Sequence, residues 1–415
     1  MADYRGIAYL KNKLDTKVSR VNMRYKYYEM KNEVKDYSKT IPPQMRWLSA
    51  CLGWCGKAAD SMADRLVFYQ FDNDNFDMNG IFAMNNPDII FDSAILSALI
   101  SSCSFIYISK DEDGFPRLQV IDGGNATGII DSITGMLNEG YAVLERKDGI
   151  PVLEAYFTRE ETAYYVNGKK VDVYENDAPY ALLVPIIYKP DAVRPFGHSR
   201  ISRACMNIQQ SALRTLRRAE VSAEFYSFPQ KYALGIDPDL EIDKWQASMS
   251  SLLTFTKDED GDRPTVGQFS QQSMTPYFEQ LRMFAGVFAG ETGLTLDDLG
   301  FPSENPSSQE AIKAQHENLR LAARKAQRSF GTGFLNVGYL ASCVRDEFAY
   351  KRKQVYLTQP VWEPIFEPDS ATLSGIGDGA IKLNQAVPGY FNKDNLRNIT
   401  GIEASKLPPQ RIEQK

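Results

Sequence analysis

Residues 302–349 read PSENPSSQEAIKAQHENLRLAARKAQRSFGTGFLNVGYLASCVRDEFA. The first part is rich in Pro, Asn and Ser, as loops are, and the rest repeats apolar residues at helical spacing. Pro306 suits a first helical turn, and Ser307 with Glu310 matches a capping box. The apolar stripe behind this cap comprises Ile312, Leu319, Ala323, Ala326, Phe330, Phe334 and Val337. The pattern predicts a helix over 309–349 that is entered through a loop.

This helix would be longer than a small domain is wide, because about 1.5 Å per residue gives a straight length of roughly 60 Å. Its second half contains Gly331, Gly333 and Gly338, which favour a kink over a rigid rod. Charged residues recur beside the apolar stripe, at Lys313, Glu317, Arg320, Arg324 and Arg328. Such a helix is typical of a chain that spans a large assembly or links two domains.

The composition is that of a soluble globular protein, with 43% hydrophobic and 24% charged residues, and 415 residues allow two or three domains. There is no apolar run long enough for a membrane span, and the N-terminus lacks the apolar segment of a secretory signal. Five cysteines, sparse and odd in number, indicate a reducing cytoplasm. Cys51 and Cys55, four apart on an expected helix, are predicted to be buried small hydrophobic residues.

The formal net charge of −6 argues against a protein that coats DNA through general positive charge. The charge is uneven, since residues 1–46 carry eleven Lys/Arg against five Asp/Glu, and residues 236–262 carry two against eight. Patches of opposite sign suit a protein with several docking faces. Only two histidines occur, His198 and His316, which leaves little material for a histidine-based triad or metal site.

The remaining patterns predict an α+β fold, with a mainly antiparallel sheet over residues 40–190. Asn167-Gly168, between two strand-like runs, is a strong signal for a two-residue hairpin. Helices are expected over 1–39, 44–64, 87–100, 201–227, 274–294, 378–387 and 393–399. Strands are expected over 65–71, 104–110, 117–121, 127–131, 141–147, 152–158, 161–166, 181–190, 228–235, 252–257 and 353–364. Residues 72–80 are expected to be a loop, and 228–272 a small α/β insert between two helices.

Catalytic motifs are not found in the sequence. GWCGK (53–57) lacks the spacing of a phosphate loop, and GIGDG (375–379) lacks the βαβ unit of a dinucleotide site, so both are predicted to be plain turns. The carboxylates of 258–262 lack the distant glutamate of a calcium loop and are expected to form a solvated turn. The sequence therefore predicts neither an enzyme nor a cofactor or metal site.

Arginines cluster on two of the expected helices, within 203–218 and within 320–328. The commonplace explanation is a solvated helix face whose charges pair three or four residues apart. The functional alternative is a charged subunit interface or a surface near nucleic acid. The residue pattern leaves both open.

Three segments, in their order, resemble the portal protein of tailed bacteriophages, in the long-tailed siphophage class. They are PFGHSRISRACMNIQQSALRTLRRAEVSAEFYSFPQKYALG (195–235), GETGLTLDDLGFPSENPSSQEAIKAQHENL (290–319), and VWEP with AIKLNQAVPGYFNKDNLRNITGI (within 361–402). The resemblance covers residues 40–402 and rests on the ordered set, because this family has no single catalytic-style signature. It implies a dodecameric ring at one capsid vertex, through which DNA enters and leaves.

The resemblance also implies a division of the chain into wing, stem, clip, tunnel and crown. The parts would be the wing over 1–195 and 350–375, the stem helices over 196–227 and 274–293, the clip over 228–273, the tunnel loop over 294–308, the long kinked tunnel helix over 309–349, and a short crown and tail over 376–415.

Roles for individual residues follow from the same resemblance. The tunnel loop would present Thr295, Asp297, Asp298, Ser303, Glu304, Asn305 and Ser307 to DNA. The clip would dock partners through Asp258, Glu259 and Asp260, and the neighbouring subunit would be contacted by Arg203, Arg214, Arg217, Arg320, Arg324 and Arg328. A loop of acidic and small polar residues binds phosphates weakly, which suits DNA that must slide.

The implied partners are the terminase large subunit, a head–tail adaptor or connector, the major capsid and scaffolding proteins, and double-stranded DNA bound without sequence specificity. No cofactor and no membrane is implied, and the location would be the portal vertex of the virion, with the host cytoplasm during assembly. Two alternatives stay open. One is a metal-dependent nuclease or hydrolase built on the carboxylate-rich loops, and the other is a non-channel structural adaptor that binds helices along 308–349.

Overall fold

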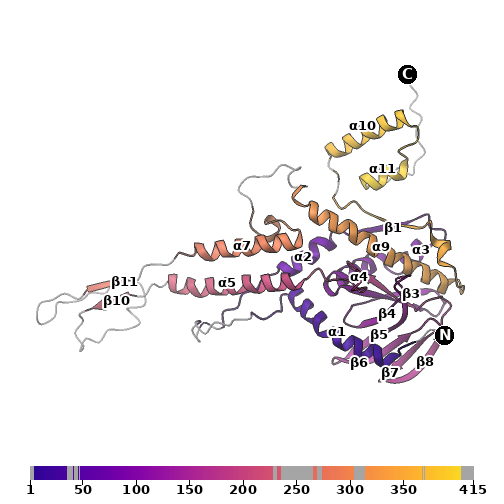
Figure 1. Ribbon diagram of the computed structural model, residues 1–415, viewed down its shortest axis with the longest axis horizontal. Helices are drawn as coiled ribbons and strands as arrows, with labels where there is room; N and C mark the ends of the chain where they lie inside the picture. Colours follow the sequence, from indigo (N-terminus) through magenta and orange to yellow (C-terminus); the bar gives the residue numbers. More distant parts are fainter. Residues whose placement is uncertain are drawn as a thin grey trace, which may run out of the picture. The chain divides into compact units, whose positions relative to one another are not determined.

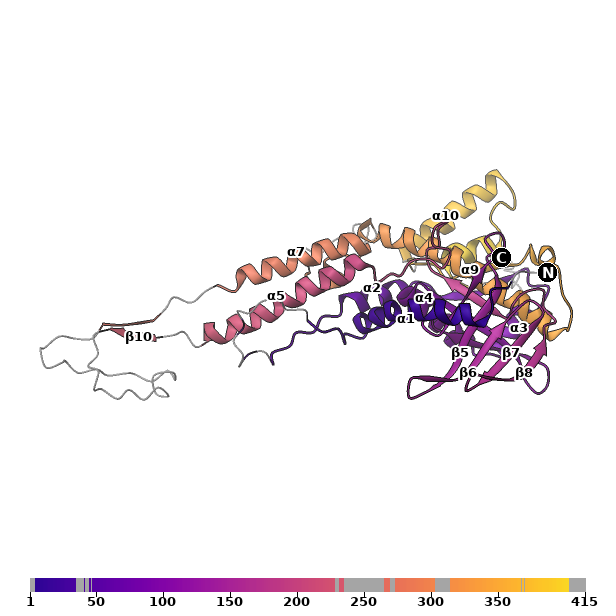
Figure 2. The same cartoon turned by 60° about the horizontal axis from the view of Figure 1, so that its bottom comes forward.

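The computed structural model describes residues 4–34, 41, 45, 47–227, 231–234, 265–268, 273–302, 314–366, 368 and 370–402. The chain divides into two compact units (Figure 1, Figure 2). Unit 1 comprises residues 1–31, 55–202 and 307–415, and unit 2 comprises residues 32–54 and 203–306. The mixture of helices and antiparallel strands is the α+β class predicted from the sequence.

The helices of unit 1 are α1 (Ile7–Tyr28), α2 (Trp54–Ala63, whose first residue falls in unit 2), α3 (Met78–Ala83), α4 (Pro87–Ser101), α9 (Glu317–Arg345), α10 (Ser370–Ala386) and α11 (Lys393–Thr400), with a short 3-10 helix η3 (Arg352–Val355). Its strands are β1 (Phe68–Asp72), β2 (Cys103–Lys110), β3 (Pro116–Ile121), β4 (Ala126–Ile130), β5 (Leu137–Lys147), β6 (Ile150–Phe157), β7 (Glu161–Val166), β8 (Lys169–Glu175), β9 (Leu183–Ile187) and β12 (Gln359–Trp362). Unit 2 holds α5 (Arg203–Ser227), β10 (Lys231–Leu234), β11 (Thr265–Gln268), α7 (Thr275–Thr292) and the 3-10 helix η2 (Asp297–Leu299).

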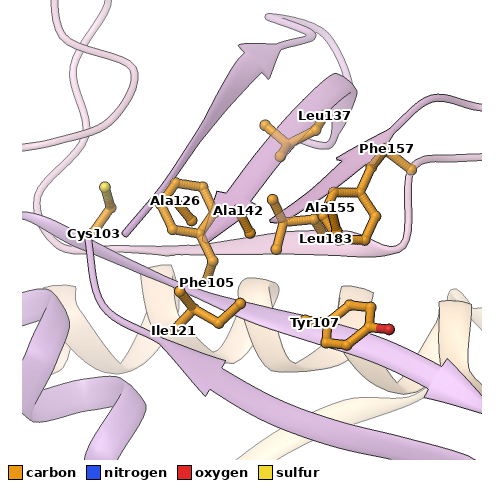
Figure 3. Close-up of a cluster of buried hydrophobic side chains, with 11 residues drawn as sticks. Cys103, Phe105, Tyr107, Ile121, Ala126, Leu137, Ala142, Ala155, Phe157 and Leu183 are labelled. Atoms are coloured by element: carbon orange, nitrogen blue, oxygen red, sulfur yellow. The ribbon is translucent and has the colours of Figure 1, made fainter. Parts of the chain in front are cut away.

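Two antiparallel sheets form the centre of unit 1. The smaller has the order β3-β2-β9 and the larger the order β4-β5-β6-β7-β8. Alternate side chains of a strand point to opposite faces, so Phe105 and Tyr107 of β2 share one face. They pack into one buried cluster with Ala142, Ala155 and Phe157 of the larger sheet (Figure 3). This cluster joins the two sheets and confirms the predicted antiparallel core.

The predicted Asn167-Gly168 hairpin is confirmed. Val166 of β7 pairs with Lys169 of β8, so the turn has two residues. Its φ angles are +49° at Asn167 and +77° at Gly168. Two successive positive φ angles are what a type I′ turn requires, and Asn and Gly adopt them at least cost.

The other face of the smaller sheet is covered by α4 and α9. Ser104 Oγ of β2 donates to the Ala94 carbonyl of α4 at 2.7 Å, and α9 packs along β9. Aromatic rings connect these helices to the β1–β12 strand pair. The Phe334 ring of α9 lies 4.7 Å from Phe91 of α4 and 5.6 Å from Phe68 of β1, measured between ring centroids. Residues far apart in the sequence therefore share one aromatic core.

The long helix α9 is confirmed, although it ends before the predicted residue 349. It begins at Glu317, after a turn at His316, and ends at Arg345. Glu347 has φ +49°, a left-handed conformation that a right-handed helix cannot continue through. The predicted Ser307–Glu310 cap lies outside the described residues.

The glycines of α9 have a packing role that the sequence did not reveal. The helix is unbroken across them. A Cβ atom at Gly331 would lie 2.7 Å from Pro360 Cγ, and one at Gly338 would lie 2.8 Å from Met78 Sδ. Such distances are too short for a real side chain, so these glycines let β12 and α3 approach the helix. The predicted kink is not needed to explain them and stays a prediction.

Helix α1 is fixed to the larger sheet by two buried carboxylates. Glu139 is 1% exposed and accepts the backbone N–H of Gly6, at the start of α1, at 3.1 Å. Glu154 is 4% exposed, lies 2.8 Å from Lys11 Nζ, and accepts a hydrogen bond from the Tyr141 hydroxyl. Burial and the adjacent Glu154 raise the pKa of Tyr141, so its hydroxyl stays protonated and donates.

The positive charge of residues 1–46 is less available for docking than predicted. Lys13 Nζ donates to the Gly128 carbonyl at 2.7 Å, and Arg24 donates to the Ser101 carbonyl at 2.9 Å. Burial lowers the pKa of Lys13 and of Arg24. Part of the N-terminal positive patch is therefore internal to unit 1.

Replacing Glu154 by alanine is expected to destabilise unit 1 by about 2–3 kcal/mol. The change leaves the buried Tyr141 hydroxyl without its acceptor and removes the partner of Lys11. Thermal unfolding of the purified protein would show the loss as a lower midpoint. The exposed Glu145, replaced by alanine, should stay within about 0.5 kcal/mol of wild type. Equal midpoints for the two variants would contradict this account of α1.

Several predicted boundaries are wrong. The helix predicted over 1–39 ends at Tyr28, and Met30 adopts φ +58° just beyond it. The helix predicted over 44–64 begins at Trp54. Cys51 therefore precedes the helix and is exposed, whereas Cys55 is buried as predicted.

Two glycine-containing stretches predicted as turns are helical. Gly56 lies within α2, where a Cβ atom would be 3.0 Å from the Tyr28 carbonyl oxygen, so glycine allows α1 to come close. GIGDG (375–379) lies within α10. Leu373, Ile376 and Ala380 repeat there at three- and four-residue spacing, a helical period that outweighs the low helix propensity of glycine.

Helix α3 and strand β11 were not predicted from the sequence, whereas strand β10 was. Helix α3 occupies part of 72–80, which was predicted to be a loop. Its start is fixed by Asp74, whose side chain accepts the backbone N–H of Asn79 at 2.8 Å. Strand β10 was predicted, and its partner β11 was not. The rest of the insert 228–272 lies outside the described residues.

Unit 2 is built on the antiparallel helix pair α5 and α7. Thr215 Oγ1 donates to Gln280 Oε1 at 2.9 Å, and the hydroxyls of Ser222 and Tyr277 lie 2.8 Å apart. The pair β10–β11 belongs to the connection between the two helices. Of the helices in the described ranges, none is long and apolar enough to cross a membrane.

Candidate assembly surface

One face of α7 is apolar and exposed. Phe288 and Ala285 are buried, and the Phe288 ring lies 5.6 Å from Trp54. On the other side of the helix, Met283 and Val287 are each 54% exposed. This outer face of α7, defined by Met283, Gly286, Val287 and Gly290, has the character of a surface that another chain covers.

The two glycines strengthen this interpretation. A Cβ atom at Gly286 or Gly290 would meet nothing within 4 Å, so neither glycine is required by the packing of the single chain. Glycine inside an exposed helix costs about 1 kcal/mol relative to alanine. Glycines four residues apart make a flat strip on which a second helix can lie closely. In the sequence this signal is the spacing Gly286-x-x-x-Gly290, which was not among the predicted interface residues.

The predicted tunnel-loop residues fall into two groups. Thr295 and Asp298 form hydrogen bonds with each other: Asp298 Oδ2 accepts both the backbone N–H and the hydroxyl of Thr295, each at 2.9 Å. The Thr295 hydroxyl also accepts the Asp298 N–H at 3.2 Å. Asp297, between them, is exposed. Ser303, Glu304, Asn305 and Ser307 lie outside the described residues.

Replacing Asp298 by alanine is expected to loosen the turn that follows α7. A lost cap of this kind costs about 1 kcal/mol, so amide hydrogen exchange at Thr295 should speed up about fivefold. Asp297, replaced by alanine, is the matched control and should leave that exchange unchanged. Equal exchange rates in the two variants would show that Asp298 does not hold the turn.

The predicted interface arginines have different environments. Arg320 lies 2.6 Å from Glu317 on the same helix, and hydrogen bonding by Arg320 holds the pKa of Glu317 below its ordinary value. This pair matches the commonplace explanation of the arginine pattern. Arg324 and Arg328 are exposed on α9.

The arginines of α5 are distributed around the helix. Arg203 is exposed, Arg214 is half-buried and donates to Ser211 Oγ at 2.9 Å, and Arg217 is half-buried. An interface role for any of them stays a prediction. The predicted clip residues Asp258, Glu259 and Asp260 lie outside the part of the chain that the structure describes.

Metal-binding side chains do not gather in the described ranges. No cluster of three or more His, Cys, Asp or Glu side chains there could hold a metal ion. His198 Nε2 lies 2.6 Å from Asp191 Oδ2, and the His316 ring stacks on Phe366. His198 thus has a partner in its own loop, and His316 has one in a segment fifty residues away.

Comparison with known proteins shows the class to which this chain belongs, the phage portal proteins. The chain belongs to the family of phage portal proteins of the SPP1 Gp6-like type, which it matches over residues 7–373. The resemblance deduced from the sequence is thereby confirmed. The protein is a structural component of the virion rather than an enzyme, so the nuclease or hydrolase alternative is rejected.

Individual relatives are distant. The chain is 23% identical to the portal proteins of Mycobacterium phages L5 and D29, over 93% of its own length and 83% of theirs. Among solved structures it is similar to a chain of the virion of a native gene transfer agent particle, with 14% identity and a TM-score of 0.44 over 86% of this chain and 90% of that one. A chain from the neck of the empty particle gives 13% identity and a TM-score of 0.45 over 88% and 93%.

Proposed function

We propose that copies of this chain assemble head to tail into a closed dodecameric ring at one capsid vertex, and that double-stranded DNA passes through the ring. Membership of the portal family supports the role. The observation that carries the assembly is the outer face of α7, where Met283 and Val287 are exposed beside two glycines that the single chain does not need. A head-to-tail ring joins two different surfaces of each subunit, so one self-complementary patch is not required.

The division of labour along the chain follows from the same proposal. The wing comprises residues 1–195 and 350–375, which belong to unit 1 except for 32–54. Helices α5 and α7 supply the stem (196–227 and 274–293). The insert between these helices, 228–273, is the clip. Residues 294–308 are the tunnel loop, α9 is the tunnel helix of 309–349, and α10 with α11 belongs to the short crown of 376–415. The antiparallel α5–α7 pair with β10–β11 in its connection supports the stem–clip–stem order.

The partners follow from the position at the vertex. The clip, with Asp258, Glu259 and Asp260, docks the terminase large subunit and later the head–tail adaptor, while the wing meets capsid and scaffolding proteins. A net charge of −6 supports DNA contact that is weak and blind to sequence, because each phosphate bound by a cation would resist sliding. The protein acts at the virion vertex and, during assembly, in the host cytoplasm.

Electron microscopy of the purified full-length protein tests the proposal. End-on views are expected to be round, with an opening on the axis. Particles that are compact in every view, without an axial opening, would overturn it. Such particles would favour the structural adaptor that works without a channel.

A further inference from the structure

The outer face of α7 carries a regular stripe that includes one charge. Glu279, Met283, Gly286 and Gly290 follow one another at spacings of four, three and four residues, which places them on one side of the helix. Glu279 is exposed, and its carboxylate makes no ion pair with any residue in the described ranges. The stripe thus consists of an acidic residue, an apolar residue and two glycines, which leave the helix surface flat.

Helix α5 carries a stripe with the same spacing in the opposite chain direction. Arg218, Arg214, Ser211 and Asn207 are separated by four, three and four residues and are exposed or half-buried. Arg218 is exposed and likewise has no ion pair among the described residues. This stripe has two basic residues, Arg218 and Arg214, at one end and two short polar residues at the other. The two stripes are complementary in charge and in bulk.

The hydrogen bonds within unit 2 show which residues of the two helices are level with each other. Tyr277 meets Ser222, and Gln280 meets Thr215. Glu279 lies between these two contacts on α7, and Arg218 lies between them on α5. Both helices rise by about 1.5 Å per residue, so the levels stay matched along the antiparallel pair.

In a ring whose axis runs parallel to α5 and α7, level residues of one chain remain level across the interface, because the rotation moves a subunit sideways and leaves every residue at its height. In such a ring the α5 of the next subunit presents Arg218 at the height of Glu279, and presents Ser211 and Asn207 at the heights of Gly286 and Gly290. The register inside the chain predicts the register between chains.

We infer that the α7 stripe of one subunit packs on the α5 stripe of the next. Glu279 pairs with Arg218 across the interface, and the two glycines face Ser211 and Asn207. Small residues on both helices allow the short end of the 8–10 Å range of helix–helix distances. This contact rests on the proposed ring and names the surface that receives the α7 face.

Cysteine cross-linking tests the register directly. Gly290→Cys combined with Asn207→Cys, oxidised in the assembled full-length protein, is expected to give a covalent ladder of subunits on a denaturing gel. Each single variant is the control for the native cysteines and should give no ladder beyond that of wild type. Rings that form but yield only monomers on the gel would overturn the inference and leave the proposed ring standing. A wild-type protein that never forms rings would instead remove the proposed function.

Charge exchange tests the ion pair. Glu279→Arg alone and Arg218→Glu alone should each raise the concentration needed for half-maximal assembly by about tenfold. An equal mixture of the two variants should recover assembly, because every interface of an alternating ring then joins opposite charges. A mixture that assembles no better than either variant would place the partner of Glu279 elsewhere. Loss of DNA binding without loss of assembly in Arg218→Glu would assign α5 to DNA and contradict the contact.

Discussion

Replacing Gly290 by leucine is expected to prevent ring assembly while leaving the single subunit as stable as wild type or slightly more stable. Nothing lies within 4 Å of a Cβ atom at this position, so the side chain has room in the single chain. Leucine also favours helix by up to about 1 kcal/mol over glycine. In a ring the same side chain would hold the neighbouring helix off the flat face of α7, and that loss is repeated at every interface.

Two measurements separate these effects. Sedimentation velocity should show a monomer where wild type forms a large particle, and thermal unfolding should show an unchanged or higher midpoint. Gly290→Ala should have a smaller effect on assembly, because it adds one methyl group. Ser19→Leu adds a leucine at an exposed position of α1 and should assemble normally. Normal assembly of Gly290→Leu would remove the α7 face from the interface.

Replacing Phe334 by alanine is expected to cost about 3–5 kcal/mol of stability in unit 1. Phe334 is fully buried, and its ring lies 4.7 Å from Phe91 and 6.2 Å from Trp362. The change empties the place where α9, α4 and β12 meet. It should therefore separate the long helix from the sheet more readily than any exposed substitution.

The corresponding measurement is the midpoint of thermal unfolding, which should fall by about 10 °C for a unit of this size. Phe348→Ala is the matched control, because that ring is 57% exposed and its loss leaves no cavity. Its midpoint should change little. Equal shifts in the two variants would show that the aromatic core does not hold α9 in place.

The sequence predicted those parts of the fold whose signals are local. The apolar repeat of α9 and the alternation in the strands were sufficient to predict these elements, because burial of one face sets the spacing of apolar residues along the chain. Asn167-Gly168 was sufficient because few residues adopt two positive φ angles. The order of the segments gave the family even though identity to its curated relatives is only 23%.

Features that depend on contacts distant in sequence were not predicted. Gly56 and Gly331 were interpreted as a turn and a kink. In the structure each is glycine because another segment, at Tyr28 or at Pro360, lies too close for a side chain. Helix propensity carries no information about such contacts. The buried Glu139 was invisible for the same reason, since only the fold brings it to the start of α1.

The candidate assembly surface also depends on contacts that the sequence does not show. Arginines were predicted to lie at the subunit interface because their charge can be read from the sequence, but Arg320 pairs with Glu317 of its own helix. The exposed glycines of α7 were not predicted to be interface residues, because a missing side chain indicates an interface only when the surrounding packing is known. Position 290 became a candidate once the structure placed it on an open face.

The mass of the intact particle tests the central claim most directly. Native mass spectrometry of the full-length protein, whose subunit has a mass of 46.8 kDa, should give one closed species at the dodecameric multiple of that mass. That species should persist on dilution, because a closed ring has no free end from which subunits are lost. A monomer, a dimer, or an open-ended series of masses under the same conditions would contradict the claim that this chain builds a portal ring.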